Sequence, residues 1–281
     1  MYEAFFDLER LPFSLSPDPR FLWPSETHLE GLSILEYGIR YRKGFLLLTG
    51  DVGAGKTTLL RTALERIPQD MDVALVMNTA GLEPLDLFKL IAAEFGLTGP
   101  FHTKADYIIA LNRCLIEKLE AGLSAVLIID EAQNLEYRAL EEVRLLSNLE
   151  TDDEKLLQIV LTGQPELRRT LRSPAARPLR QRLALEHHIQ PLRPAEIAPY
   201  LEHRIRTAGG RCDQVFAPGV EPIFFEFSKG CPRLVNQLAD RALVSACVQG
   251  VRPVPPALVE QKAKEMGARP EMIGDSAGTE F

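Results

Sequence analysis

The fold of this chain is decided by the stretch Gly50-Asp51-Val52-Gly53-Ala54-Gly55-Lys56-Thr57. It fits the pattern G-x-x-x-x-G-K-[ST], whose glycines let successive backbone N–H groups turn inward around phosphate oxygens. A helix that begins at the end of such a loop adds a dipole that favours negative charge at its N-terminus. The stretch therefore predicts a loop that binds the phosphates of a nucleoside triphosphate.

Single residues of this loop have separate predicted roles. Lys56 is expected to reach the β- and γ-phosphates, and the Thr57 hydroxyl is expected to complete part of an octahedral Mg²⁺ shell. The next residue, Thr58, is also predicted to belong to the nucleotide-binding site, although it need not contact the metal.

The sequence on either side of the loop agrees with this interpretation. Residues 44–49 form a short apolar run, as expected of a strand buried on both faces of a parallel sheet. After the loop, apolar residues recur at helical spacing up to Ile67, and Pro68 ends the pattern. A glycine-rich turn with no ligand is the alternative, but the full match between a strand and a helix favours the phosphate loop.

A second apolar run, residues 125–129, ends in Asp130-Glu131. Ligands collect at the carboxyl ends of strands in an open α/β sheet, so Asp130 is predicted to hold Mg²⁺ through its water shell. Glu131 is the candidate general base, because a carboxylate one residue further on can orient the water that attacks the γ-phosphorus. The alternative is that the pair only caps a helix that begins near Glu136.

Strands and helices alternate up to about residue 193. Further strands are predicted at residues 73–77, 156–161 and 183–189, and helices at about 29–39, 85–95, 104–119 and 138–149. Strands that alternate with helices imply a parallel sheet with right-handed crossovers. The predicted fold class is therefore α/β, a P-loop NTPase sheet sandwiched by helices.

Helices alone follow, at about residues 196–207, 220–227, 233–247 and 257–264, and they predict a small all-helical lid. The expected organisation is an N-terminal segment at 1–42 that packs on the nucleotide site, an α/β nucleotide-binding domain at 43–193 and the lid at 194–266. Residues 267–281 are small and polar and are expected to be a disordered tail.

Composition restricts the class of partner and the compartment. The formal net charge of −7 gives no overall basic field to attract nucleic acid or anionic lipid. The 4 cysteines form no C-x-x-C pair, which argues against a zinc site and for a reducing cytosol. We find no secretion signal and no apolar stretch near the ~20 residues that span a bilayer. The expected location is cytoplasmic, or peripheral at the inner membrane through a partner.

With the phosphate loop, the Asp130-Glu131 pair and a helical lid in this order, the chain resembles an AAA+ ATPase. Finer motifs resemble the ExeA-type ATPases of the general secretion pathway, and more distantly the transposition ATPases of the Mu B and TniB kind. The motifs are Tyr2-Glu3-Ala4-Phe5-Phe6, Pro12-Phe13-Ser14-Leu15-Ser16-Pro17-Asp18-Pro19-Arg20-Phe21-Leu22, Tyr37-Gly38-Ile39, Asp130-Glu131-Ala132-Gln133-Asn134-Leu135 and Leu161-Thr162-Gly163-Gln164-Pro165-Glu166-Leu167. The resemblance covers roughly residues 1–265 and implies that the triphosphate is ATP, used with Mg²⁺.

The resemblance also implies roles for residues further along the chain. Gln164 matches the sensor 1 position, which contacts the γ-phosphate, and Thr162 is the alternative polar group for this role. The non-functional alternative is a polar turn before Pro165. Gly230-Cys231-Pro232-Arg233 is similar to the sensor 2 motif, in which Arg233 reaches back to the phosphates. An arginine there could equally be a solvated residue of a first helical turn.

Six arginines between residues 168 and 182 form the only dense basic run of this acidic chain: Arg168, Arg169, Arg172, Arg177, Arg180 and Arg182. Three interpretations stay open: a solvated charge run, a patch for nucleic-acid phosphates, or an arginine finger donated to the nucleotide of a neighbouring subunit. We favour the finger, with Arg182 first and Arg180 second, which requires a homo-oligomer. His187 and His188 point to opposite faces of a strand, so neither is expected to bind a metal.

The leading functional hypothesis is a cytoplasmic ATPase that energises or regulates a cell-envelope secretion, pilus or polysaccharide export assembly, with a protein of that machine as its partner. Longer members of the ExeA-type family continue into a membrane span, whereas this sequence is expected to have none of its own. A DNA-binding regulator of transposition is the alternative, in which duplex DNA is the partner. A nucleotide-gated scaffold with slow turnover is the third hypothesis, and the intact Asp130-Glu131 pair argues against it.

Overall fold

A computed structural model of the chain describes residues 1–68, 70–77, 79–151 and 154–267. The chain divides into two compact units, one formed by residues 24–190 and the other by residues 1–23 together with the chain from residue 191 onwards. The last described helix, α13 (Pro256–Gly267), ends at Gly267. The disordered tail is expected from residue 267, and its remaining residues, 268–281, lie outside the described residues.

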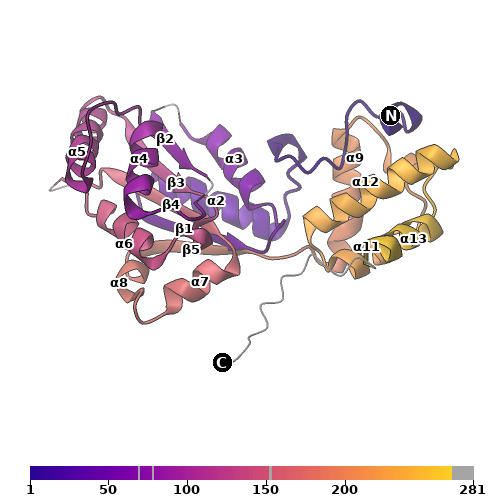
Figure 1. Cartoon of the computed structure of the whole chain (residues 1–281). Coiled ribbons are helices and arrows are strands. Elements are labelled where there is room, and N and C mark those ends of the chain that lie inside the picture. The colour runs from indigo at the N-terminus through magenta and orange to yellow at the C-terminus, as the bar shows by residue number, and fades with distance from the viewer. Residues whose placement is uncertain (69, 78, 152–153, 268–281) are drawn as a thin grey trace. The chain divides into compact units, whose positions relative to one another are not determined.

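Unit 24–190 is built on a five-stranded sheet in the order β2-β3-β4-β1-β5, and all four strand pairings are parallel (Figure 1). The strands are β1 (Phe45–Gly50), β2 (Met71–Val76), β3 (Ser124–Ile129), β4 (Leu157–Gly163) and β5 (Leu183–Ile189). Each lies close to a strand predicted from the sequence. The predicted parallel sheet is therefore confirmed.

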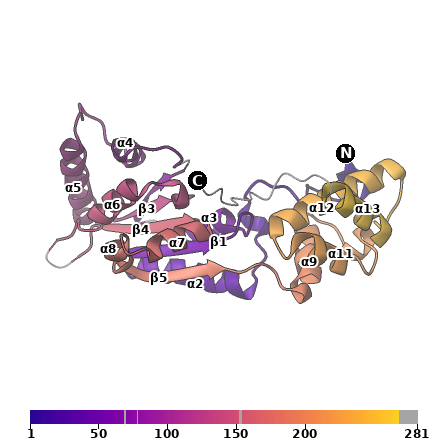
Figure 2. The same ribbon diagram turned by 60° about the horizontal axis from the view of Figure 1, so that its bottom comes forward.

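Helices cover both faces of this sheet, as Figures 1 and 2 show. On one side lie α2 (Glu26–Arg40) and α3 (Lys56–Arg66), and on the other lie α4 (Pro84–Glu94), α5 (Lys104–Glu120), α6 (Tyr137–Leu146) and α7 (Pro165–Arg172). Two short elements complete the unit, the 3-10 turn η2 (Ala132–Asn134) and α8 (Arg177–Arg180). Successive side chains of β1 alternate between the two faces, so covering both faces buries all six residues of that strand.

The other unit is helical after residue 191 and has a separate hydrophobic core. Its elements there are η3 (Pro194–Glu196), α9 (Ile197–Thr207), α10 (Cys212–Val215), α11 (Glu221–Ser228), α12 (Pro232–Gln249) and α13. The clearest of them is α12, whose stripe of leucine, valine and alanine is fully buried from Val235 to Ala246. Four of these helices lie where the 3.6-residue spacing of apolar residues predicts them.

The N-terminal residues 1–23 pack into the helical unit, whereas α2, which belongs to the same predicted segment, packs on β5. The short elements α1 (Tyr2–Phe5) and η1 (Pro19–Phe21) carry buried aromatic side chains into the helical core. The Tyr2 hydroxyl donates to Asp240 Oδ1 on α12 at 2.6 Å. The physical reason for the division is therefore the run of aromatic residues before Pro24, which is buried among helices.

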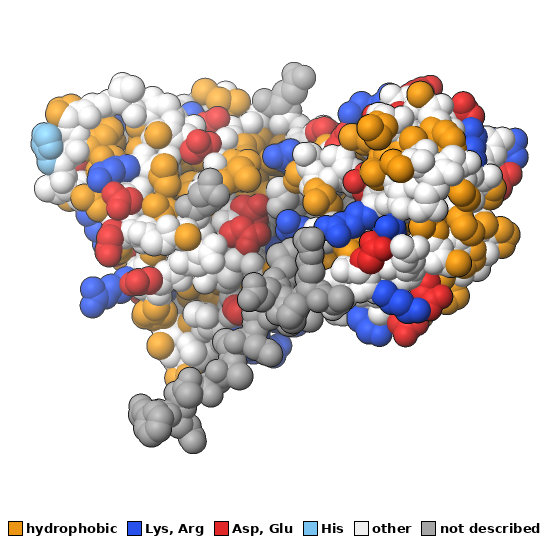
Figure 3. All heavy atoms as spheres, turned by 45° about the vertical axis from the view of Figure 1, so that its right-hand side comes forward, with side chains coloured by type: hydrophobic (Ala, Val, Ile, Leu, Met, Phe, Trp, Pro, Cys, Tyr) orange, Lys and Arg blue, Asp and Glu red, His pale blue; other side chains and the backbone are white. Residues whose placement is uncertain are grey.

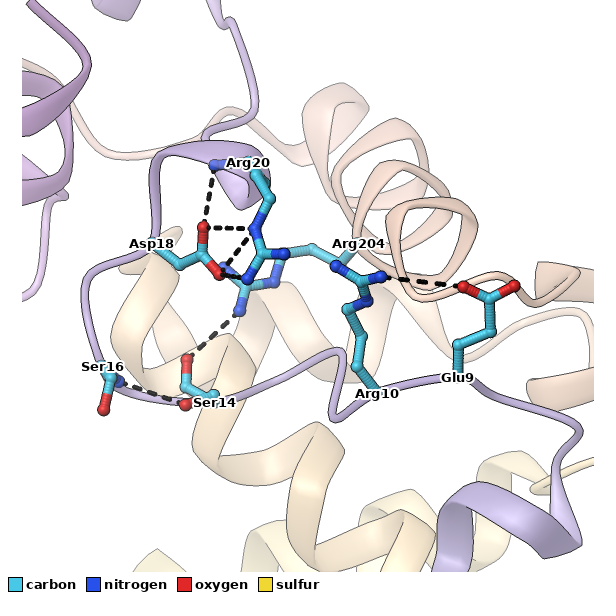
Figure 4. A network of polar contacts seen from close by, with 7 residues as sticks. All are labelled: Glu9, Arg10, Ser14, Ser16, Asp18, Arg20 and Arg204. Atoms are coloured by element: carbon cyan, nitrogen blue, oxygen red, sulfur yellow. Dashed lines mark hydrogen bonds and ion pairs between the residues drawn. The ribbon is translucent and has the colours of Figure 1, made fainter. Parts of the chain in front are cut away.

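Arg204 of α9 fastens the loop between α1 and η1 (Figure 4). Its guanidinium donates to Pro12 O at 2.6 Å and to Ser14 O at 3.2 Å, and the side chain is only 8% exposed. The same guanidinium lies 4.8 Å from the centre of the Phe21 ring. A planar donor group and an aromatic face thus hold an irregular segment that has few backbone hydrogen bonds of its own.

Candidate active site

The phosphate loop runs from the end of β1 to the start of α3 and adopts the backbone that the motif demands. Gly53 and Gly55 have φ values of 80° and 96°, a left-handed region that side chains disfavour. No side chain caps α3, which begins at Lys56, so its first N–H groups point out of the helix end toward the loop. The Lys56 ammonium is buried and donates to Gly50 O at 2.9 Å and Asp51 O at 3.1 Å.

The predicted metal residues lie together at the carboxyl edge of the sheet. The Thr57 hydroxyl donates to Asp130 Oδ2 at 3.0 Å, and the carboxylate is only 3% exposed. The other oxygen, Oδ1, accepts the Glu131 N–H at 2.9 Å and the hydroxyl of Thr162. Hydroxyl and carboxylate oxygens are the hard donors that Mg²⁺ prefers, so this set fits the predicted ion. Thr58 lies in the first turn of α3, where its carbonyl accepts the Thr62 hydroxyl at 2.9 Å.

Glu131 is held in an unusual backbone and by two side-chain amides. Its φ of 53° lies in the left-handed region, which is uncommon for a residue other than glycine and is often found at functional sites. Its Oε2 accepts Gln133 Nε2 at 2.6 Å and Gln164 Nε2 at 3.1 Å. Its carbonyl accepts the Thr79 hydroxyl at 2.8 Å. The carboxylate therefore has a fixed direction at the edge of the phosphate-binding region.

The two sensor 1 candidates have different surroundings. Thr162 is fully buried inside β4 and bonds Asp130, whereas Gln164 directly follows β4, is half-buried and bonds Glu131. The Gln164 N–H also donates to Gln133 Oε1 at 3.0 Å. The structure thus brings Gln164 beside the predicted base. The sequence interpretation missed Gln133 and Thr79, although Gln133 stands within a quoted motif.

The arginine run spans α7 and α8 and ends at Arg182. Its first helix, α7, begins just after the carboxyl end of β4, whereas Arg182 lies at the amino end of β5, the opposite edge of the sheet. Arg182 directly precedes the seven-residue strand β5, so about 23 Å of extended backbone separates it from the carboxyl edge of that strand. Burial lowers the pKa of Lys155, which lies just before β4, and the positive charge of Arg182 lowers that pKa further. Two of the arginines form ion pairs, Arg168 with Glu186 at 3.5 Å and Arg169 with Glu166 at 2.5 Å. Arg180 and Arg182 are exposed.

Arg233 is the second residue of α12 and is exposed. It belongs to the helical unit, so its role as sensor 2 stays a prediction. In the other unit, His187 Nε2 lies 2.8 Å from Thr27 O on α2, and His188 Nδ1 lies 3.0 Å from the Thr49 hydroxyl on β1. Among the described residues, no group of three or more His, Cys, Asp or Glu side chains could hold a metal ion.

The fold and these contacts define a class of protein. Residues 39–171 match the family described as AAA domain. The ORC2 protein of Aeropyrum pernix, solved as ADPNP–ADP complexes, matches with a TM-score of 0.69 and 18% identity over 92% of this chain and 72% of that chain. Cdc6p from Pyrobaculum aerophilum matches with a TM-score of 0.70 and 18% identity over 90% of this chain and 70% of that one. The chain therefore has the P-loop fold of AAA+ ATPases, as predicted.

A relative of much higher identity narrows this class. The chain is 42% identical over 254 residues to the general secretion pathway protein A of Aeromonas hydrophila, a match that covers 89% of this chain. It spans 46% of the length of that protein. The chain is thus similar over most of its length to a protein of the ExeA type, and the resemblance that the motifs predicted is confirmed. Within the described residues, no helix is both long and apolar enough to cross a bilayer.

Proposed function

We propose that unit 24–190 binds ATP with Mg²⁺ and hydrolyses it to ADP and phosphate. One observation carries the proposal: the carboxylate of Asp130 is bonded to Thr57 of the phosphate loop, and Glu131 stands beside it with a fixed carboxylate. The phosphate loop, the proposed metal ligands and the proposed general base thus lie at one edge of the sheet. The match to the AAA domain family supports the same class of reaction.

The proposed roles follow from these positions. The N–H groups of the loop and the Lys56 ammonium orient the β- and γ-phosphates, while Thr57 and Asp130 hold the ion, which when bound neutralises phosphate charge. Glu131 accepts a proton from the attacking water. Gln164 contacts the γ-phosphate as the sensor 1 residue. Its hydrogen bond to Glu131 couples that contact directly to the base.

The active form in this proposal is a homo-oligomer. Arg182 stands at the amino edge of the sheet, a strand length away from the loop of its own chain. An arginine at that place can stabilise transition-state charge only on the nucleotide of a neighbouring copy, and such a group is worth about 10³-fold or more in rate. Arg180 is the second candidate for this finger. Arg233 of α12 completes the set as the sensor 2 residue of the lid.

The biological role that we propose is to energise or regulate a cell-envelope secretion, pilus or polysaccharide export assembly. The identity of 42% with a protein named for the general secretion pathway supports this role. The partner would be a protein of that machine. The proposed location is the cytoplasm, or the surface of the inner membrane through that partner.

A DNA-binding regulator remains a second candidate because of the arginines of α7 and α8. Arg172, Arg177, Arg180 and Arg182 are exposed, as a phosphate-binding surface requires. The net charge of −7 opposes this function, and Figure 3 shows acidic side chains among the basic ones on the face that it presents.

One experiment separates these proposals: ATP turnover and particle mass, measured for the protein alone, with duplex DNA at two salt concentrations, and with anionic vesicles. DNA stimulation that falls steeply with salt would favour the regulator and reject the secretion role. The matched variant is Glu131→Gln, whose amide oxygen can still accept the bonds of Gln133 and Gln164. It should bind ATP normally and hydrolyse it about 10²- to 10⁴-fold more slowly, and near-normal turnover would remove Glu131 as the base.

A further inference from the structure

The first turn of α2 contacts the phosphate loop through a buried histidine. His28 is 4% exposed, and its Nε2 lies 3.0 Å from Ala54 O in the loop. A carbonyl oxygen only accepts hydrogen bonds, so this nitrogen carries the proton. The other ring nitrogen, Nδ1, lies 2.5 Å from the Ser25 hydroxyl oxygen. The imidazole therefore bridges the start of α2 and the loop.

The bond to Ala54 O also fixes the direction of the next N–H group. The carbonyl of Ala54 and the N–H of Gly55 belong to one planar trans peptide, so they point in opposite directions. A donor that holds the carbonyl toward α2 therefore turns the Gly55 N–H away from α2. In loops of this pattern the backbone N–H groups must face the phosphates. His28 is thus placed to aim one of the donors that the triphosphate needs.

Two further contacts show that the ring and the loop are fitted to each other. A Cβ atom at residue 55 would lie 3.1 Å from His28 Nε2, so the imidazole occupies the space that any side chain there would take. Ala54 is 3% exposed and His28 is 4% exposed, so the bond between them is shielded from water. A buried acceptor without a partner destabilises the conformation that buries it.

The first turn of α2 is itself anchored, so it can serve as a fixed support. Ser25 is the N-cap of α2, and its side chain accepts the His28 N–H at 3.3 Å. Thr27 ties the turn to β5 and the residue after it: its carbonyl accepts from the His187 ring at 2.8 Å, and its hydroxyl oxygen accepts the Gln190 N–H at 3.2 Å. The imidazole is therefore attached to the sheet independently of the loop.

From these contacts we infer that His28 is a positioning residue for triphosphate binding, which acts through the Ala54–Gly55 peptide without touching the nucleotide. The inference rests on the proposed binding of ATP. It assigns to α2 a part in the site, although His28 lies 26 residues before Ala54 in the chain.

The test uses two amide variants that differ only in reach. In His28→Gln the amide nitrogen can occupy the place of Nε2 and donate to Ala54 O, whereas in His28→Asn the amide reaches only the place of Nδ1. We expect the Gln variant to bind a fluorescent ATP analogue within about twofold of the wild type. The Asn variant should bind it about fivefold to tenfold more weakly, as expected for one lost hydrogen bond.

Steady-state kinetics and thermal unfolding of the same proteins complete the test. The Asn variant should raise KM more than it lowers kcat. Both variants should stay folded at the assay temperature, and the Asn variant should melt at the lower temperature because its Ala54 carbonyl lacks a donor. Equal affinities of the Gln and Asn variants, whether both normal or both weak, would overturn the inference, since donation to Ala54 O would then not matter. A wild-type protein that binds no triphosphate would instead overturn the proposed function, so the two failures are distinguishable.

Discussion

Replacement of Thr162 by valine tests how the metal-binding carboxylate is held. The Thr162 hydroxyl is fully buried and donates to Asp130 Oδ1. Water has no access to take its place. In Thr162→Val the same oxygen keeps only the Glu131 N–H, 2.9 Å away, while Oδ2 keeps the Thr57 hydroxyl at 3.0 Å.

The magnitude follows from the kind of bond that is lost. A hydrogen bond to a charged group contributes about 1.5–3 kcal/mol, and valine nearly preserves the shape, so unit 24–190 should lose about 2 kcal/mol of stability. A partner that orients a metal ligand also affects metal affinity by about tenfold or more. The valine variant should therefore need about tenfold more Mg²⁺ for half-maximal nucleotide binding. The control is Thr162→Ser, which keeps the hydroxyl and loses one methyl group, about 1 kcal/mol.

The assay must report on the correct unit. The single tryptophan, Trp23, belongs to the helical unit, so its fluorescence does not follow unfolding of the sheet. Amide hydrogen exchange in β3 and β4 measures the local free energy of opening, and a Mg²⁺ titration of nucleotide binding measures the functional effect. The reasoning is refuted if the valine and serine variants require the same Mg²⁺ concentration and differ by less than about 0.5 kcal/mol in stability.

Three further predictions concern other parts of the chain. Arg204→Lys keeps the charge but not the paired donation to Pro12 and Ser14, so Trp23 fluorescence in urea should report a helical unit about 2 kcal/mol less stable. Burial, and then the charge of Arg168, hold the pKa of His188 below its usual value. Because the unfolded chain binds that proton near pH 6.5, stability should fall as the pH drops below that value. The fall, seen as urea midpoints at two pH values, should be smaller in His188→Asn. Finally, mixing Arg182→Ala with Lys56→Ala protein should restore some ATP turnover, and no rescue at any ratio would count against a finger that acts between subunits.

The elements that could be predicted from sequence are those with a strong local pattern. The strands β1 and β3 are apolar throughout because both of their faces are covered, and a short apolar run between glycines or polar residues is typical of such a buried strand. The loop glycines and Lys56 were found in the same way, because a local motif carries both the backbone requirement and the chemistry. Neither needed knowledge of distant residues.

The features that sequence could not supply depend on contacts between distant segments. In α7 the apolar face is reduced to Leu167 and Leu171, and three of its eight residues are arginines, so the helical pattern is weak in the sequence. Nothing around His28 distinguishes it from a residue that simply fills an amphipathic helix. The sequence suggests one N-terminal segment, residues 1–42, and does not show that the aromatic residues before Pro24 join the helical core. Which core they join is decided by side-chain contacts such as those of Arg204.

The end of β4 links the two halves of the proposed chemistry. Thr162 and Gln164 are two residues apart, and their side chains bond two adjacent carboxylates, Asp130 and Glu131. Any displacement of this part of the chain therefore acts on the metal-binding carboxylate and on the base together. For this reason Thr162→Val should lower turnover at saturating Mg²⁺ as well as raise the Mg²⁺ requirement, although Thr162 is buried and its hydroxyl bonds Asp130, not Glu131. A change confined to the Mg²⁺ requirement would mean that the two carboxylates are held independently.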